Sequence, residues 1–256
     1  MSTIKVPLND VVRWLDDYLN IQQISDWPEA LNGLQLENPG YVTRVAAAVD
    51  ACESVISQAT FWKCDLLLVH HGLFWSGQKP IIRQNYRKFR TAINSGLAIY
   101  SAHLPLDIHP EIGNNHLLAN AIGMPENRLP FLELRGVQVG LVANWEISLR
   151  NLLARIEEVL GRLPHLAPGG PPTTSRVGIC TGAAGAEVAA AANKGIDTFI
   201  TGEGPHWSYT LAEELGINLI YAGHYLTETF GVRALADALR KQFGLPWEFI
   251  DHPTGI

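Results

Sequence analysis

The sequence contains few cysteines, and they follow no pattern. Cys52, Cys64 and Cys180 are widely spaced and form neither a C-x-x-C motif nor an even set that could build a disulfide framework. Such sparse use of thiols is typical of proteins in a reducing compartment. The N-terminal residues also lack the apolar segment and small-residue cleavage site of a secretory signal peptide. We therefore expect a cytoplasmic protein whose cysteines serve as small buried side chains.

A long apolar run and an excess of basic residues are also absent. No stretch of the sequence reaches the length that a membrane-spanning helix needs. Lys and Arg total 19 against 25 Asp and Glu, which gives a net charge of -6. Proteins that bind nucleic acids or membrane surfaces usually carry a basic face, so neither partner is expected. The remaining composition, 47% hydrophobic and 17% charged over 256 residues, is that of a globular protein.

Short apolar runs alternate with amphipathic segments along most of the chain. The runs predict buried strands and the amphipathic segments predict helices, so the sequence indicates an α/β fold. Residues 164–172 are rich in Pro and Gly and predict a linker or surface loop. Strands are predicted at 44–49, 65–69, 97–102, 137–143, 176–180, 197–201, 218–221 and 247–250, and helices at 9–20, 52–61, 80–94, 114–121, 149–160, 186–193, 205–215 and 227–243.

The two halves of the sequence resemble each other. Segments 44–65 and 176–197 each run from an Arg-Val pair that opens one predicted strand to the Asp that opens the next, over the same spacing. Later strands end in the similar sequences Tyr-Ser-Ala-His at 100–103 and Tyr-Ala-Gly-His at 221–224. A repeat of this kind predicts two similar α/β halves related by a pseudo-twofold axis. The expected halves are 1–130 and 131–256, forming one compact unit.

Two adjacent histidines follow the most apolar of the predicted strands. His70 and His71 come directly after Leu-Leu-Leu-Val and are followed by Gly72. Ligands of α/β proteins bind at the carboxyl ends of such strands. Gly72 permits a turn that would bring both imidazoles to one place, and it lets other groups approach the backbone closely. The pair therefore indicates metal ligands or a general base, with two surface histidines as the plainer interpretation.

Each half then carries a histidine followed four residues later by a carboxylate. The pairs are His103 with Asp107, and His224 with Glu228. Pro105 predicts a loop between the members of the first pair, because proline disrupts a regular helix. The second pair is expected one turn apart near the N-terminus of a helix, with helix capping or solvated charges as the plainer uses of both carboxylates.

Together these side chains predict a metal centre between the two halves. Imidazole and carboxylate ligands without a thiolate suit Zn, Fe, Mn or Ni at a catalytic site. Six ligands are too many for one ion with an open position and suit two divalent transition metal ions. The predicted ligands are His70, His71, His103, Asp107, His224 and Glu228.

Four segments of the chain resemble signatures of the NGG-interacting-factor-three-like family, whose bacterial YbgI-like members are described as GTP cyclohydrolase 1 type 2. They are 32–35, 70–75, 101–107 and 223–228. The resemblance implies two similar α/β domains without the inserted middle domain of some members, and a dinuclear metal centre at the same six positions. It also implies a homo-oligomer, commonly a hexameric ring, and a reaction in which metal-activated water opens the imidazole ring of GTP and releases formate.

The same resemblance draws attention to the sequence that follows the strand at 197–201. Glu203 is interpreted as a base beside the metals and His206 as a proton carrier or substrate contact, although a helix-start carboxylate and a surface histidine explain them equally well. Trp75 and Trp207 could stack on a planar base, although packing is their commoner use. The loop 181–185 lies where a phosphate could bind, but a plain turn explains it better.

The sequence leaves open whether the chain is an enzyme. A metal-dependent hydrolase of the GTP cyclohydrolase type is the first interpretation, although no cluster of Lys and Arg for a triphosphate is evident. One alternative is a non-enzymatic protein that handles metals or binds a partner. Another is a metal-dependent phosphoester hydrolase, because fold and metal site do not fix the substrate.

Overall fold

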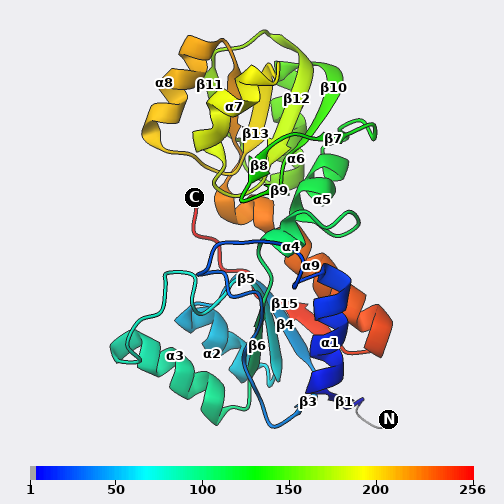
Figure 1. Cartoon of the computed structure of the whole chain (residues 1–256), viewed down its shortest axis with the longest axis vertical. Helices are drawn as coiled ribbons and strands as arrows, with labels where there is room; N and C mark the ends of the chain where they lie inside the picture. Colours follow the sequence, from blue (N-terminus) through cyan, green and yellow to red (C-terminus); the bar gives the residue numbers. More distant parts are fainter. Residues whose placement is uncertain (1–3) are drawn as a thin grey trace. The chain divides into compact units, whose positions relative to one another are not determined.

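The computed structural model describes residues 4–256 and divides them into two compact units, each shown in Figure 1. The first unit comprises the chain through Leu106 and the segment Gly231–His252, and the second comprises Asp107–Phe230 and Pro253–Ile256. This division differs from the predicted halves, because the change of unit falls at Leu106 instead of residue 130. The C-terminal half of helix α9 (His224–Phe243) also belongs to the first unit, where it buries Val232 and Leu235.

The first unit is built on a five-stranded sheet in the order β15-β4-β5-β6-β2. Strand β2 runs antiparallel to β6, and the other neighbours are parallel. The elements of this unit are β1 (Val6–Pro7), α1 (Leu8–Leu19), β2 (Gly33–Leu36), β3 (Tyr41–Val42), β4 (Val45–Asp50), α2 (Glu53–Phe61), β5 (Leu66–His71), α3 (Arg83–Asn94), β6 (Ala98–Ser101) and β15 (Trp247–Phe249), and α4 (Leu104–Asp107) ends at the junction of the units.

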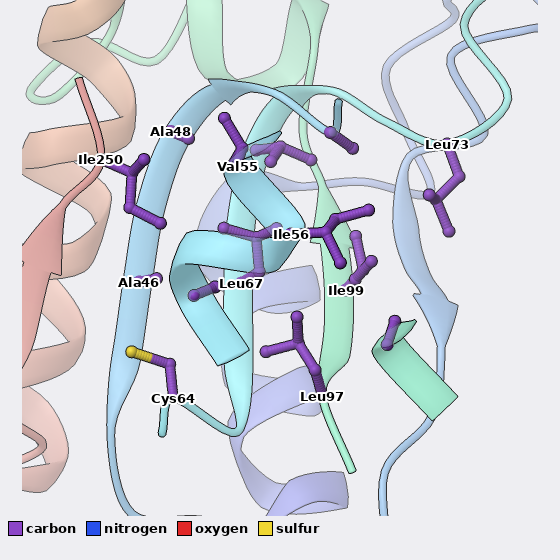
Figure 2. Close-up of a cluster of buried hydrophobic side chains, with 14 residues drawn as sticks. Ala46, Ala48, Val55, Ile56, Cys64, Leu67, Leu73, Leu97, Ile99 and Ile250 are labelled. Carbon is purple, nitrogen blue, oxygen red and sulfur yellow. The ribbon is translucent and has the colours of Figure 1, made fainter. Parts of the chain in front are cut away.

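Helices α2 and α3 cover one face of this sheet. Figure 2 shows Ala46 and Leu67 on neighbouring strands beneath Val55 and Ile56 of α2. Alternate residues of a strand point to the same face, so the short apolar runs supply this layer directly. Cys64 belongs to the same cluster, and burial raises the pKa of its thiol to about 11. It therefore stays protonated at neutral pH and packs as a small apolar side chain, as the sequence predicts.

Helix α1 supplies an apolar stripe to the first unit. The prediction of a helix over 9–20 is confirmed to within one residue, with Val11 and Leu15 fully buried at helical spacing. The expected side-chain cap at Asn9 or Asp10 is wrong. The helix starts one residue earlier, after Pro7, and no side-chain cap is formed there.

A buried hydrogen bond joins α1 to β6. Tyr100 is fully buried, and its hydroxyl donates to Oδ1 of Asp16 over 2.7 Å. Burial raises the pKa of Asp16, although the hydrogen bond from Tyr100 opposes that rise. An acid whose pKa is raised by folding binds more protons in the folded state, so its contribution to stability falls as the pH increases through the raised pKa.

Tyr100→Phe is expected to lower the free energy of unfolding by about 1–3 kcal/mol, because Asp16 loses its buried donor. The loss should be larger at about pH 7.5 than at about pH 4.5, since the pKa of Asp16 rises further without the hydroxyl and its ionised form is then the more costly. Urea unfolding at both pH values measures this, and an equal loss at both would contradict it.

The second unit is built on a six-stranded sheet in the order β11-β14-β13-β12-β10-β7. Strands β12, β13 and β14 are parallel, and the others are antiparallel to their neighbours. The elements are α5 (Asn114–Ala121), β7 (Leu129–Pro130), β8 (Glu133–Leu134), β9 (Val137–Gln138), β10 (Leu141–Ser148), α6 (Leu149–Leu160), β11 (His165–Pro168), β12 (Thr173–Cys180), η1 (Gly185–Glu187), α7 (Val188–Asn193), β13 (Thr198–Thr201), α8 (His206–Leu215) and β14 (Asn218–Tyr221). In the part of the chain that the structure describes, no helix combines the length and apolar character needed to cross a membrane.

The segment 164–172 is neither a linker nor a free loop. Its first part forms β11, which pairs antiparallel with β14 at the edge of the sheet. A Cβ at Gly169 or Gly170 would lie 2.3 or 2.5 Å from a backbone carbonyl oxygen, that of Ala212 or Asp197. The glycines therefore allow close backbone packing, which a count of Pro and Gly cannot distinguish from flexibility.

Equivalent hydrogen bonds appear in the two units and confirm the first landmarks of the repeat. The N–H of Asp65 donates to the carbonyl of Arg44 over 3.0 Å, and the N–H of Asp197 donates to that of Arg176 over the same distance. Each aspartate carbonyl accepts the N–H that opens the third parallel strand. Each unit therefore contains the same three-stranded parallel element. The pseudo-twofold axis stays a prediction.

The strand ends align with a shift of one residue from the expected register. The N–H of Ala102 donates to Val69 in the first unit, and the N–H of Ala222 donates to Thr201 in the second. His103 therefore corresponds to Gly223 and not to His224. The similar words Tyr-Ser-Ala-His and Tyr-Ala-Gly-His are not structural equivalents, because backbone pairing and not the last histidine sets the register.

Candidate metal centre

Three buried histidines gather in the first unit. His70 and His71 are the last residues of β5, and His103 follows β6. The ring centroid of His70 lies 4.8 Å from that of His71 and 4.9 Å from that of His103. One ring nitrogen from each residue lies within 4.8 Å of the others. The structure thus brings together the three predicted ligands of this unit, and their role as ligands stays a prediction.

The Nδ1 atom of each of these rings is fixed by an oxygen that can only accept a hydrogen bond. Each Nδ1 must therefore carry the hydrogen, which makes Nε2 the nitrogen with the lone pair in the neutral ring. This arrangement is the usual way in which proteins orient metal-binding histidines. The acceptors are the carbonyl of Ala102 for His70 (2.9 Å), Asp50 for His71 (3.0 Å) and Asp26 for His103 (2.9 Å).

Asp26 is a functional residue that the sequence analysis missed. Its carboxylate accepts hydrogen bonds from Asn32 and from the N–H of Leu104, in addition to His103. Burial alone would raise the pKa of Asp26, but the hydrogen bond and charge of His103 outweigh that effect and lower it. Asn32 also accepts the N–H of His103 over 2.7 Å, which gives the motif at 32–35 a physical role. That motif was the available signal, because it had no other use in the sequence.

Gly72 is required by the side chain of Gln35. A Cβ on Gly72 would lie 2.3 Å from the amide group of Gln35. That amide accepts the N–H of Leu73 over 2.7 Å and donates to the carbonyl of Ala30 over 3.0 Å. The predicted close approach at this glycine is therefore present, and a side chain of the same unit makes it.

Trp75 lies against the histidines. Its ring centroid is 4.3 Å from that of His103 and 4.7 Å from that of His71. The side chain is 36% exposed, so one part of the ring faces away from the protein interior. This packing narrows access to the two imidazoles. Stacking of Trp75 on a planar base stays a prediction.

Asp107 is presented by a short helix, and the prediction of a loop is wrong. Helix α4 contains Pro105 in its first turn, where proline is tolerated because the N–H there has no helical partner. Oδ1 of Asp107 accepts from Asn114 over 2.8 Å and from the hydroxyl of Thr181 over 3.5 Å. Helix α5 and the end of β12 thus hold this carboxylate in the second unit.

His224 and Glu228 lie one turn apart at the start of α9, as predicted. Their Nε2 and Oε2 atoms are 3.1 Å apart, and Nδ1 of His224 donates to Glu203 over 2.9 Å. Burial alone would lower the pKa of His224, but the hydrogen bonds and charges of Glu228 and Glu203 raise it to about 9. The metal-free imidazole is therefore protonated at neutral pH, and a metal ion would have to replace the proton on Nε2.

The loop 181–185 positions the site instead of binding phosphate. Its amides are already used, for example from Gly182 to Thr227, from Ala184 to Thr201 and from Gly185 to the carbonyl of Glu203. Gly182 has φ +70°, and a Cβ there would lie 2.4 Å from Oε1 of Glu228. This loop therefore packs directly against one predicted ligand and supports the backbone of Glu203.

The structure separates the remaining predicted contacts. His206 begins α8 and lines a cavity of the second unit together with Glu203. Trp207 is 50% exposed on the same helix and, among the described residues, is not part of that lining. Glu203 contacts His224 directly, whereas the catalytic and substrate-binding roles of all three residues stay predictions.

Comparison with known proteins identifies the family. Residues 6–255 match the model of the family described as Duf34/NIF3 (NGG1p interacting factor 3). A protein of Deinococcus radiodurans named GTP cyclohydrolase 1 type 2 homolog is 41% identical over 97% of this chain and 94% of its own length. The solved structure of TTHA1606 from Thermus thermophilus shares 39% identity with a TM-score of 0.88, and that of protein ybgI, titled as of unknown function, shares 33% with a TM-score of 0.90; each match covers 98% of this chain and 100% of the other. The chain belongs to the Duf34/NIF3 family.

Proposed function

We propose that this chain is a dinuclear metal-binding protein of hydrolase type that opens the imidazole ring of GTP and releases formate. The observation that supports it best is the state of the histidines. In all four predicted histidine ligands, an acceptor oxygen fixes Nδ1, so Nε2 is the nitrogen available to a metal. Surface or structural histidines have no reason to share this arrangement. The substrate is proposed from the name of the relatives.

The donor set fits divalent transition ions. Four imidazoles and two carboxylates without a thiolate suit Zn, Fe, Mn or Ni. We propose that His70, His71, His103, Asp107, His224 and Glu228 hold two such ions, which would activate water and offset developing negative charge when bound.

The protein's own residues would keep the ligands in their binding state. Asp26 and Asp50 hold the hydrogens on Nδ1 of His103 and His71. Glu203 does the same for His224 and would take up the charge of that ring's proton. His206, exposed at the start of α8, could carry a proton between the cavity and water. We further propose a cytoplasmic homo-oligomer, with a hexameric ring as the expected form.

Metal content tests the first part of this proposal. His71→Ala and Glu228→Ala should each lower the metals bound per chain, measured by elemental analysis after loading with Zn, Mn, Fe or Ni. His252→Ala, which removes an exposed histidine outside the predicted ligands, is the matched control. Loss of both ions in either variant would indicate one shared centre, and loss of one ion would indicate separate sites. Unchanged content in both folded variants would exclude the assigned ligands.

Formate release from GTP by the loaded protein tests the second part, with His71→Ala as the control. Formate from the wild type alone would support the cyclohydrolase. Protein that holds two ions but releases no formate with any metal would favour a metal-handling protein or a phosphoester hydrolase, which a panel of phosphoesters would distinguish.

A further inference from the structure

The second unit contains a cavity that the metal ligands do not explain. Its volume is about 850 Å³, which is within the usual range for sites that bind small molecules. It lies beyond the carboxyl ends of β13 and β14 and is bounded by β11 and the start of α8, elements that Figure 1 shows next to one another. In α/β proteins this end of the parallel strands is where ligands bind.

Three aromatic rings form one wall of this cavity. The ring of His165 on β11 lies 5.6 Å from that of Tyr209 and 5.9 Å from that of Tyr221, with interplanar angles of 30° and 26°. The hydroxyl of Tyr221 is held by Ser208 at 2.7 Å, which fixes that ring in place. Rings that are nearly coplanar in orientation and line a cavity offer a face on which a planar ring can stack.

Polar groups of both charges line the same cavity. Glu203 contributes a carboxylate whose Oε1 accepts from His224, and the acidic side chain also faces the cavity. Arg162 contributes a guanidinium that donates to the carbonyl of Gly255 over 2.6 Å. An arginine has five N–H donors, so this single bond leaves others for an anion. His206 adds a third ionisable group on the rim.

We propose that this cavity binds a small molecule with a planar heteroaromatic ring and an anionic substituent, of the size of a nucleotide. The ring would stack on Tyr209 and His165. Its N–H donors would meet the carboxylate of Glu203, and its anionic group would pair with Arg162. Because Glu203 also holds His224, a ligand bound here would lie beside one of the predicted metal ligands. This site goes beyond the proposed function, because binding in it needs neither ions nor turnover.

The test uses the full chain treated with a chelator, so that a failure of the metal proposal cannot affect it. Calorimetric titration with GTP should show binding to the wild type. Tyr209→Ala and Arg162→Gln should each weaken that binding by at least about fivefold, since one stacked base or one charge-assisted pair contributes at least that much. Inorganic triphosphate should bind more weakly than GTP by a similar factor, and guanosine should also bind more weakly because it lacks the anionic group.

Matched controls are Tyr86→Ala and Arg13→Gln, which remove the same side chains from exposed positions of the first unit. Circular dichroism verifies the fold of each variant, and Tyr209→Leu replaces Tyr209→Ala should the latter not fold. The proposal is overturned by an absence of GTP binding in the wild type, by equal affinities in wild type and cavity variants, or by triphosphate binding as tightly as GTP.

Discussion

Gly182→Ala is expected to displace Glu228 and to destabilise the second unit by about 2–5 kcal/mol. About 1–2 kcal/mol comes from placing a Cβ at φ +70°, and about 1–3 kcal/mol comes from the contact of that Cβ with the carboxylate. Glu228 is only 2% exposed, so its carboxylate cannot move away into water at low cost. Metal binding should fall together with stability, because the change pushes on a predicted ligand.

Gly195→Ala separates the two contributions. Gly195 has φ +71°, almost the same conformation, but nothing lies within 4 Å of a Cβ built there. This variant should show the backbone cost alone and keep its metal content. Urea unfolding and elemental analysis of both proteins measure the difference. Equal stability losses in the two variants would show that the contact with Glu228 has no effect.

Asp26→Asn is expected to weaken metal binding by roughly 10–100-fold while the chain still folds. The asparagine amide would present a donor to Nδ1 of His103 where the aspartate presents an acceptor. The ring would then carry its hydrogen on Nε2, the nitrogen that a metal needs. The acceptor for the N–H of Leu104 is retained, so a loss of only about 1–3 kcal/mol in stability is expected.

Competition with a chromophoric chelator measures the metal affinity of this variant. Asp237→Asn is the matched control, because Asp237 pairs with Arg240 and Lys241 on the exposed side of α9. Its metal affinity should equal that of the wild type. If Asp26→Asn bound metal as tightly as the control, the hydrogen bond to His103 would have no part in the centre.

The sequence by itself determined the elements that depend on near neighbours. Helices α5 and α6 begin and end at the predicted residues, because periodicity and terminal glycines act within a few positions. The spacing of His224 and Glu228 likewise fixed their contact, since residues four apart share a helix face. The resemblance of short motifs identified the family, which the match over residues 6–255 confirms.

Tertiary structure alone decided the features that depend on partners far along the chain. Asp26 holds His103 across 77 positions, and no local pattern marks a carboxylate for a ring so distant. Strand β11 forms in a Pro- and Gly-rich segment because β14 supplies its hydrogen bonds. Helix α4 tolerates Pro105 only because the proline falls in its first turn. In each case the partner that satisfies the backbone or fixes the side chain comes from another element, so only the folded chain reveals it.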